Sequence, residues 1–371
     1  MKKAIFEFQF LTPAILAGAN QTTAEMRIPS LRGALRWWTR FLAGEEIERD
    51  IFGYVQGKKC QPSKVILRLL KSINNSTKPD QDAVDIIGNK FDYFLWPLNP
   101  PKTNKQAGAG DMGNERKRGV IQPGAKYTVA VQVKAGHEDD ESIVWLEFII
   151  KAFLLFGSLG TRSRRAYGSV WPVSAEFDAE EWDIPQTVDE LIYEANSFLY
   201  DNSLSIYRLA DSCRDYKQAI NKCSDFLKNI RCGKSAHGNT ASEWGKNDHD
   251  AGLQNSGKIY RAALGLPLTQ TYSSSHKKVD YSINDWDRMA SPLHFKVIKL
   301  NNKFVPLMLV IPEYVPSNGT KVKAMIKKGG TGTFELQLDT ELLEILCNEA
   351  ESLGSGLNRI AQYPIPEEDV E

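Results

Sequence analysis

The sequence has no CxxC pair, although it contains five cysteines spread between Cys60 and Cys347. An odd number of widely spaced cysteines argues against a disulfide framework and against the usual zinc-ribbon pattern. It is typical of a protein whose thiols stay reduced. We therefore expect a cytoplasmic location and no metal or other cofactor.

The sequence also lacks a long apolar run. No stretch approaches the ~20 apolar residues that a membrane helix needs, and the most apolar one, residues 143–156, is interrupted by Glu147 and Lys151. Such a run predicts a buried amphipathic helix. The first ten residues, MKKAIFEFQF, alternate without a cleavage site of small residues, so they predict a strand and not a signal peptide. We expect no membrane association.

The chain has no net charge, since lysine plus arginine and aspartate plus glutamate both number 46. The overall charge therefore neither favours nor excludes a polyanionic partner. The charges are unevenly distributed, with acidic residues collected at 138–141, 176–194 and 367–371. This segregation leaves room for a local cationic surface on a neutral protein, which could itself be one subunit of a larger assembly.

A chain of 371 residues exceeds one comfortable hydrophobic core and predicts two domains. In residues 1–175 the element order points to a ferredoxin-like α+β domain. Its predicted strands are 3–10, 64–70, 91–98, 127–133 and 169–173, and its predicted helices are 30–44, with Ser30 as N-cap, and 141–156.

Residues 176–371 predict a second domain of the same class with helical insertions. The predicted helices are 188–199, 215–230, 257–264 and 340–351, and a strand is predicted at 204–209. A polar loop is expected at 232–256, and a hairpin at 293–312 that turns at Asn301 and Asn302.

One predicted helix, in RIPSLRGALRWWTR at 27–40, carries a row of arginines beside its apolar face. At about 100° per residue, Arg32, Arg36 and Arg40 form one stripe, and Trp37 falls on the polar half. A surface helix with ordinary ion pairs is the alternative. However, no acidic residue lies three or four positions away within this helix. An unpaired guanidinium row near an exposed indole suits phosphate contacts and base stacking.

A second stretch, GSLGTRSRRAYGSV at 157–170, combines three glycines with Arg162, Arg164 and Arg165. The glycines allow unusual backbone angles and close approach to a ligand. A helix C-cap followed by a turn is the alternative, but a cap requires one glycine and no arginine cluster. We refer to residues 157–168 as the Gly/Arg loop.

These motifs together resemble a known family. TPAILAGANQTTAEMRIPSLRGALRWWTR, the following IFG at 51–53 and the Gly/Arg loop are similar to the RAMP superfamily of CRISPR-associated proteins. Within it, the first motif resembles the first-numbered RAMP subunit of the type III-B Cmr effector complex. RAALGLPL at 261–268 and DRMASPLHFK at 287–296 extend the resemblance into the second half.

The resemblance implies two ferredoxin-like (RRM-like) domains in a non-catalytic RNA-binding subunit for antiviral defence. Its expected ligands are guide RNA, near the 3′ portion, and target RNA. Its expected neighbours are RAMP backbone subunits and a head-end RAMP subunit. The sequence shows no aromatic RNP signature, so sheet-face stacking is not required. The expected RNA contacts are Arg27, Arg32, Arg36, Trp37, Arg40, Lys117, Arg118, Arg162, Arg164 and Arg165, with backbone approach at Gly157, Gly160 and Gly168.

Two other chemistries stay open at the level of sequence. Cys213, Cys223, Cys232, His237 and His249 share one region, but their spacing does not match a zinc knuckle or ribbon. Some RAMP proteins are metal-independent endoribonucleases that process precursor guide RNA. The residues available for that reaction are His237, His249 and His276, with Tyr260, Tyr272 and Lys277.

Overall fold

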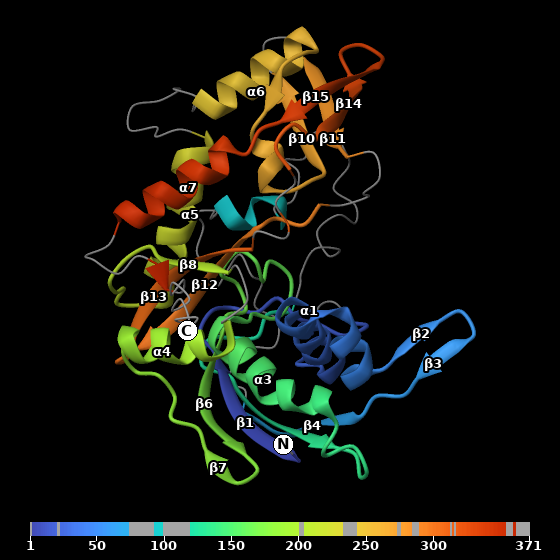
Figure 1. The fold of residues 1–371 in the computed structure, drawn as a ribbon. Coiled ribbons are helices and arrows are strands. Elements are labelled where there is room, and N and C mark those ends of the chain that lie inside the picture. The colour runs from blue at the N-terminus through green and yellow to red at the C-terminus, as the bar shows by residue number, and fades with distance from the viewer. Residues whose placement is uncertain are drawn as a thin grey trace, which may run out of the picture.

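The computed structural model contains three large β-sheets with helices packed against them (Figure 1). The structure describes residues 2–20, 23–73, 93–98, 119–199, 204–232, 243–272, 276–283, 289–311, 314, 317–353 and 359–360. No helix in these ranges is long and apolar enough to cross a membrane.

The first sheet has the strand order β4-β5-β1-β6-β7, and all its pairings are antiparallel. Apart from the short β7, this is the strand order of a ferredoxin-like fold. Alternation explains the central strand, because Phe6, Phe8 and Phe10 share one fully buried face. The strands are β1 (Lys3–Phe10), β4 (Val65–Ile73), β5 (Lys126–Val133), β6 (Val170–Phe177) and β7 (Glu180–Glu181).

Two helices pack against each other and on this sheet, α1 (Ile28–Phe52) on β4 and α3 (Trp145–Phe156) on β6. A 3₁₀ turn, η2 (Glu141–Val144), precedes α3. The predicted boundaries of the first helix are wrong. Its N-cap is Arg27, not Ser30, and Gly44 produces a kink, after which helical structure continues to Phe52. Beyond α1, the hairpin of β2 (Tyr54–Gln56) and β3 (Lys59–Gln61) projects from the molecule (Figure 1).

The second sheet, in the order β12-β13-β8-β16, repeats the same strand order with later elements. Helices α5 (Tyr216–Cys232) and α7 (Glu341–Ser352) pack against it, and α4 (Val188–Leu199) precedes it in the chain. The predicted hairpin is confirmed: Asn301 and Asn302 have φ values of 46° and 62°, as a tight primed turn requires. The strands are β8 (Ser205–Arg208), β12 (Leu293–Leu300), β13 (Lys303–Val310) and β16 (Arg359–Ile360).

A third sheet, β10-β11-β14-β15-β9, was not predicted. It lies with α6 (Glu243–Gln254) at the far end of the molecule from the first sheet (Figure 1). Its lysine-rich strand, KVKAMIKK, has the composition of a solvated surface, yet Val322 and Ala324 are fully buried. The strands are β9 (Lys258–Ile259), β10 (Leu268–Tyr272), β11 (Lys277–Ser282), β14 (Lys321–Lys328) and β15 (Thr333–Leu338).

Three other predicted segments are wrong. The strand expected at 91–98 is a 3₁₀ helix, η1 (Tyr93–Leu98), and Pro97 has no amide hydrogen to donate to a sheet. The helix expected at 257–264 consists of β9 and a 3₁₀ turn, η3 (Arg261–Leu264). The polar loop expected at 232–256 contains α6, which packs against α5 and β9. Tertiary contacts stabilise this polar helix despite its weak apolar periodicity.

The two ferredoxin-like sheets share their hydrophobic cores. Phe6 and Phe8 of the first sheet belong to the same buried cluster as Ile298 and Leu307 of the second sheet. The predicted domain boundary after residue 175 stays a prediction. The first sheet itself extends past that position, through the end of β6 and through β7.

Candidate nucleic-acid interface

The Gly/Arg loop begins where α3 ends and lies between the two ferredoxin-like sheets. Its Thr161 and Gly168 amides donate to the carbonyls of Ile15 and Pro13, each at 2.8 Å. On its other side, the Phe295 carbonyl of β12 accepts from the Ala166 amide at 2.9 Å, and the Phe295 amide donates to the Arg164 carbonyl at 3.1 Å. The loop therefore links the segment that follows β1 to β12 of the second sheet through backbone hydrogen bonds.

The backbone angles and close contacts of the folded chain explain the three glycines of this loop. Gly160 and Gly168 have φ values of 96° and 66°, which L side chains rarely adopt. A Cβ at Gly160 would lie 2.6 Å from the Ile15 carbonyl oxygen. Gly157, at the C-cap of α3, has no room beside Phe153. Close approach of these glycines to RNA stays a prediction.

Arg165 fastens the loop to β12. Its Nη1 donates to the Leu293 carbonyl at 2.9 Å, and its guanidinium lies over the Phe94 and Phe295 rings at 5.8 and 5.7 Å. Burial, together with the nearby Arg231 and Arg162 charges, lowers the pKa of Arg165 to about 9. A guanidinium group placed in this way holds the loop against β12 and is poorly presented to a polyanion.

Arg162 and Arg164 are only partly buried, and neither has an ion-pair partner among the residues that the structure describes. Arg164 lies over the Tyr314 ring at 5.8 Å. Arg162 has a positive φ of 67°, and within the described chain its Nε is buried without a hydrogen-bond acceptor. Burial lowers the pKa of both guanidinium groups from their ordinary value. An external phosphate would supply the missing acceptor and charge.

The arginine stripe of α1 is paired, which contradicts the expectation of an unpaired row. After the kink at Gly44, the chain places the buried Glu48 against this stripe, where it forms ion pairs with Arg36 and, at 3.9 Å, with Arg40. Arg32 donates to the Phe52 carbonyl at 2.5 Å. Only Arg40 keeps a half-exposed side chain, at 54%.

Trp37 is not the free stacking surface that its polar position suggested. Its ring stacks on Phe41 at 5.7 Å and lies 5.4 Å from His294, and its Nε1 donates to the Tyr314 hydroxyl at 2.6 Å. Trp37, Arg164, His294 and Tyr314 thus form one cluster between the two sheets, which we call the interdomain cluster. His294 and Tyr314 have no local signal that marks them as neighbours of this helix, since only the fold brings them near α1.

His294 is held neutral in the interdomain cluster. Burial lowers its pKa well below the ordinary value, and the Arg164 and Arg165 charges lower it further. Its Nε2 is buried without a hydrogen-bond partner in the described part of the chain. Protonation would therefore place a third cation beside two arginines in a poorly solvated position.

We expect the protein to lose stability as the pH falls below about 6.5, the ordinary histidine pKa. The unfolded chain then binds a proton at His294 that the folded chain does not, so the free energy of unfolding falls by up to about 1.4 kcal/mol per pH unit. Urea denaturation at about pH 7.5 and about pH 5.5 measures this change, with His294→Phe as control. Equal losses in both proteins would contradict it.

The remaining expected RNA contacts are less informative. Arg27 is partly buried at the N-cap of α1. Lys117 and Arg118, from the loop at 100–119, lie outside the described residues.

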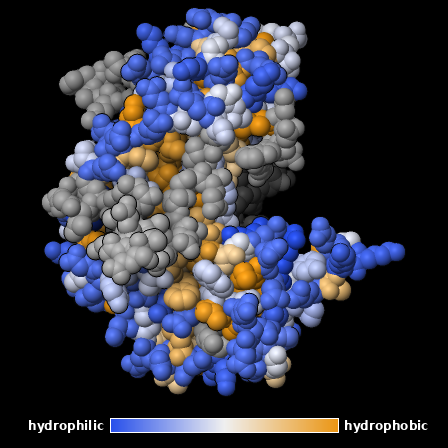
Figure 2. Space-filling model, viewed as in Figure 1, coloured by the Kyte–Doolittle hydropathy of each residue, from blue (hydrophilic) through white to orange (hydrophobic). Residues whose placement is uncertain are grey.

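Figure 2 shows a hydrophilic surface over the third sheet and the projecting hairpin, with hydrophobic residues gathered between the upper and lower parts of this face.

The described residues do not support the alternative zinc site. Cys213 and Cys223 are buried and unbridged, while His237 lies outside the described residues. Within the described ranges, no three histidine, cysteine or acidic side chains are grouped to hold a metal ion. Asp248 is fully buried and accepts hydrogen bonds from the Arg261 side chain at 2.7 Å and the Tyr260 amide at 2.7 Å.

The nuclease candidates are only partly brought together. The His249 and Tyr272 rings lie 5.0 Å apart, but the Tyr272 hydroxyl is buried against Tyr281 and donates to Gln270 at 2.6 Å. Lys277 is buried and donates to the Gly252 carbonyl at 2.8 Å. The Tyr272 and Lys277 groups are used in packing, which does not favour either as a general base open to RNA.

Comparison with known proteins agrees with this architecture. Residues 7–171 match the RAMP superfamily. Two proteins of Pyrococcus furiosus are similar in sequence. CRISPR system Cmr subunit Cmr1-2 is 25% identical over 183 residues, which make up 46% of this chain and 95% of that protein. Subunit Cmr1-1 is 26% identical over 192 residues, 47% of this chain and 49% of that protein.

Solved structures show the same fold. Apo Cmr1 from Pyrococcus furiosus has a TM-score of 0.50 at 17% identity and covers 84% of this chain and 88% of its own. A chain of the type III-B Cmr-beta complex bound to cognate target RNA also has a TM-score of 0.50, at 12% identity, over 95% and 99%. The predicted α+β fold with two RRM-like domains is confirmed. The chain is thus similar to RAMP superfamily proteins and, among them, to Cmr1 of the type III-B CRISPR Cmr complex.

Proposed function

We infer that this chain is a non-catalytic RNA-binding subunit of a type III-B CRISPR interference complex and acts in antiviral defence in the cytoplasm. Its ligands are the guide RNA, near its 3′ portion, and the target RNA. Its protein partners are the RAMP backbone subunits and a neighbouring head-end RAMP subunit. The similarity to a Cmr-beta chain solved with target RNA supports this assignment.

The observation that carries the proposal is that Arg162 and Arg164 have no ion-pair partner among the described residues. Arg36, Arg49 and Arg261 are all paired with carboxylates. By contrast, these two loop arginines have none among the described residues, although each is half withdrawn from solvent. In a chain with equal numbers of acidic and basic residues, such cations are suited to charge-assisted hydrogen bonds with phosphate.

The contacts of these side chains within the chain support different roles for the expected RNA-contact residues. Arg162 and Arg164 are the primary phosphate contacts in this proposal, and Arg27 and Arg40 are secondary contacts. Arg32, Arg36 and Arg165 act mainly by holding α1 and the Gly/Arg loop in place, because their guanidinium groups are engaged within the chain. Trp37 supports the interdomain cluster.

Affinity purification of the tagged chain from its native host tests this assignment. We expect short guide RNAs that share a repeat-derived tag, together with several other RAMP subunits. The purified complex should contain these RNAs even after a high-salt wash that removes nonspecific RNA. Recovery of the chain alone with long precursor RNA, which it cuts at one position without metal, would contradict the proposal and identify a processing nuclease.

A further inference from the structure

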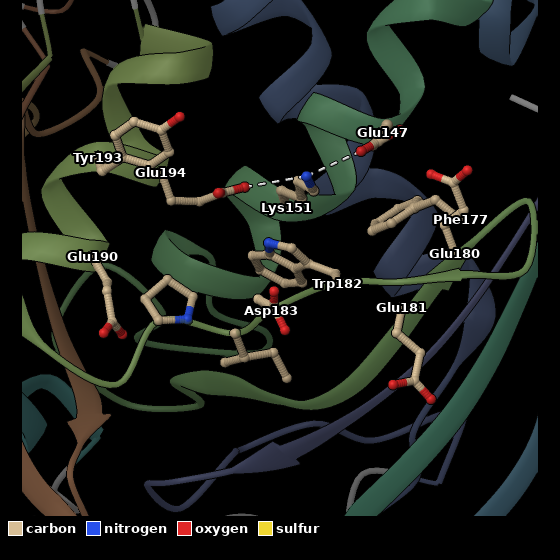
Figure 3. A pocket seen from close by; sticks show the side chains of 12 residues that line it. Glu147, Lys151, Phe177, Glu180, Glu181, Trp182, Asp183, Glu190, Tyr193 and Glu194 are labelled. Carbon is tan, nitrogen blue, oxygen red and sulfur yellow. Dashed lines mark ion pairs between the residues drawn. The ribbon is translucent and has the colours of Figure 1, made fainter.

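A second surface feature lies away from the Gly/Arg loop, a pocket of about 480 Å³ at the edge of the first sheet. Its walls come from α3, from the end of β6 with β7 and the segment that follows, and from α4 (Figure 3). The lining includes three aromatic side chains and six carboxylates, and Lys151 is its single basic residue. The pocket is therefore strongly acidic, and it opposes phosphate binding by like-charge repulsion.

Inside the pocket, the chain already binds one cation of its own, the Lys151 ammonium group. The Lys151 Nζ lies between Glu147 at 3.0 Å and Glu194 at 3.2 Å (Figure 3). It also lies 5.4 Å from the Trp182 ring centroid and 5.5 Å from that of Phe177. One ammonium group is thus already held by aromatic faces and carboxylates, the combination that favours cation–π binding.

Three acidic side chains at the rim of the pocket form no ion pair within the described chain. Glu180, Glu181 and Asp183 are exposed and have no ion-pair partner in the described part of the protein. Glu190 differs, because it accepts from the Gln186 amide at 2.7 Å and the Thr187 amide at 3.2 Å, which lowers its pKa. Two independent features accompany this excess charge. The Tyr193 ring is 80% exposed, and the buried Trp182 Nε1 has no acceptor among the described residues.

The position of the pocket favours a protein ligand over a small molecule. β7 is the outermost strand of the first sheet, and no described strand pairs with its outer edge. An extended segment lying along this edge would find free backbone groups and could place one side chain in the pocket. Within the described residues no group of carboxylates is arranged to hold a metal ion, which disfavours a free metal cation as the ligand.

We propose that this pocket docks an arginine or lysine side chain carried by an extended segment of another protein chain. The Trp182 and Tyr193 rings contact the stem and the cationic head, and Glu180, Glu181 and Asp183 neutralise the charge. The surface is thus a protein-binding site separate from the cationic Gly/Arg loop. The assignment does not depend on RNA binding.

The test uses the full chain and two fluorescein-labelled peptides, a glycine peptide bearing arginines and the same peptide with citrulline at each arginine. We expect saturable binding of the arginine peptide by fluorescence anisotropy and at least about ten-fold weaker binding of the citrulline peptide. Glu180→Gln/Glu181→Gln should weaken the arginine peptide by about three- to ten-fold. Glu45→Gln/Glu46→Gln, which removes two exposed neighbouring charges from α1, should leave the affinity unchanged.

A third variant separates the aromatic contribution from net charge. Trp182→Leu should weaken the arginine peptide while circular dichroism shows an unchanged fold. Three outcomes would each overturn the proposal: equal affinity for the citrulline peptide, equal weakening by the Glu45/Glu46 control, or no saturable binding by the unmodified chain.

Discussion

Replacing Lys296 by alanine is expected to lower the free energy of unfolding by about 3 kcal/mol. Lys296 lies on β12 with only 1% of its surface exposed, and its Nζ donates to the Gly157 carbonyl at 2.7 Å and more weakly to that of Leu154 at 3.4 Å. These carbonyls lie at the end of α3, where the Gly/Arg loop begins. The substitution therefore removes a hydrogen-bonded link between β12 and the end of α3, and leaves a cavity.

Lys296→Met is the matched control, because it keeps most of the side-chain volume and removes only the donors. We expect it to cost less than alanine, about 1–2 kcal/mol, since buried carbonyls lose a partner but no large cavity forms. Burial already lowers the pKa of Lys296 well below its ordinary value, so little stabilising charge is lost. Urea denaturation of the three proteins provides the comparison. A methionine variant as stable as the wild type would show that this contact does not fasten the loop.

The second large effect is expected in RNA binding. Arg162→Gln/Arg164→Gln should weaken the affinity of the chain for single-stranded RNA and flatten its dependence on salt. Each lost phosphate contact removes about 0.7 from the slope of log K against log salt concentration, so the double variant should lose about 1.4. Anisotropy titrations of a labelled RNA over a range of salt concentrations give both quantities.

A control with the same change in net charge is available at the surface. Arg49 and Arg214 are ion-paired with Glu45 at 2.6 Å and Asp215 at 3.2 Å. Arg49→Gln/Arg214→Gln should therefore leave the slope almost unchanged. If both double variants shift the slope equally, the effect is one of total charge and the Gly/Arg loop is not the contact surface. Arg36 and Arg165 are unsuitable for this test, because their partners lie within the fold.

Much of the fold was predictable from local patterns. The alternation of KAIFEFQF predicted β1, and the Asn301–Asn302 turn predicted the β12–β13 hairpin, because both signals act over a few residues. The third sheet was missed for a physical reason. Its strands are short or lysine-rich, and two of its pairings, β11 with β14 and β15 with β9, join segments that are distant in sequence.

The candidate site was predictable in its location but not in the role of each residue. The glycine and arginine composition of 157–168 singled out this loop, but nothing local showed that Arg165 would bind the Leu293 carbonyl. The stripe on α1 was wrongly expected to be unpaired. Its partner Glu48 follows the kink at Gly44, which composition alone suggested as a helix end.

The sequence by itself determined most strands and helices of the two ferredoxin-like sheets, because the periods of about 2 and about 3.6 that bury one face of a strand or helix are written in neighbouring residues. It also determined the presence of two arginine clusters in a chain of balanced charge. Only the tertiary structure decided which arginines are engaged. Whether a guanidinium group is free depends on the carboxylates, carbonyls and rings that folding brings to it. The kink of α1 places Glu48 against the stripe, and the packing of the two sheets brings Leu293 and Tyr314 to the Gly/Arg loop.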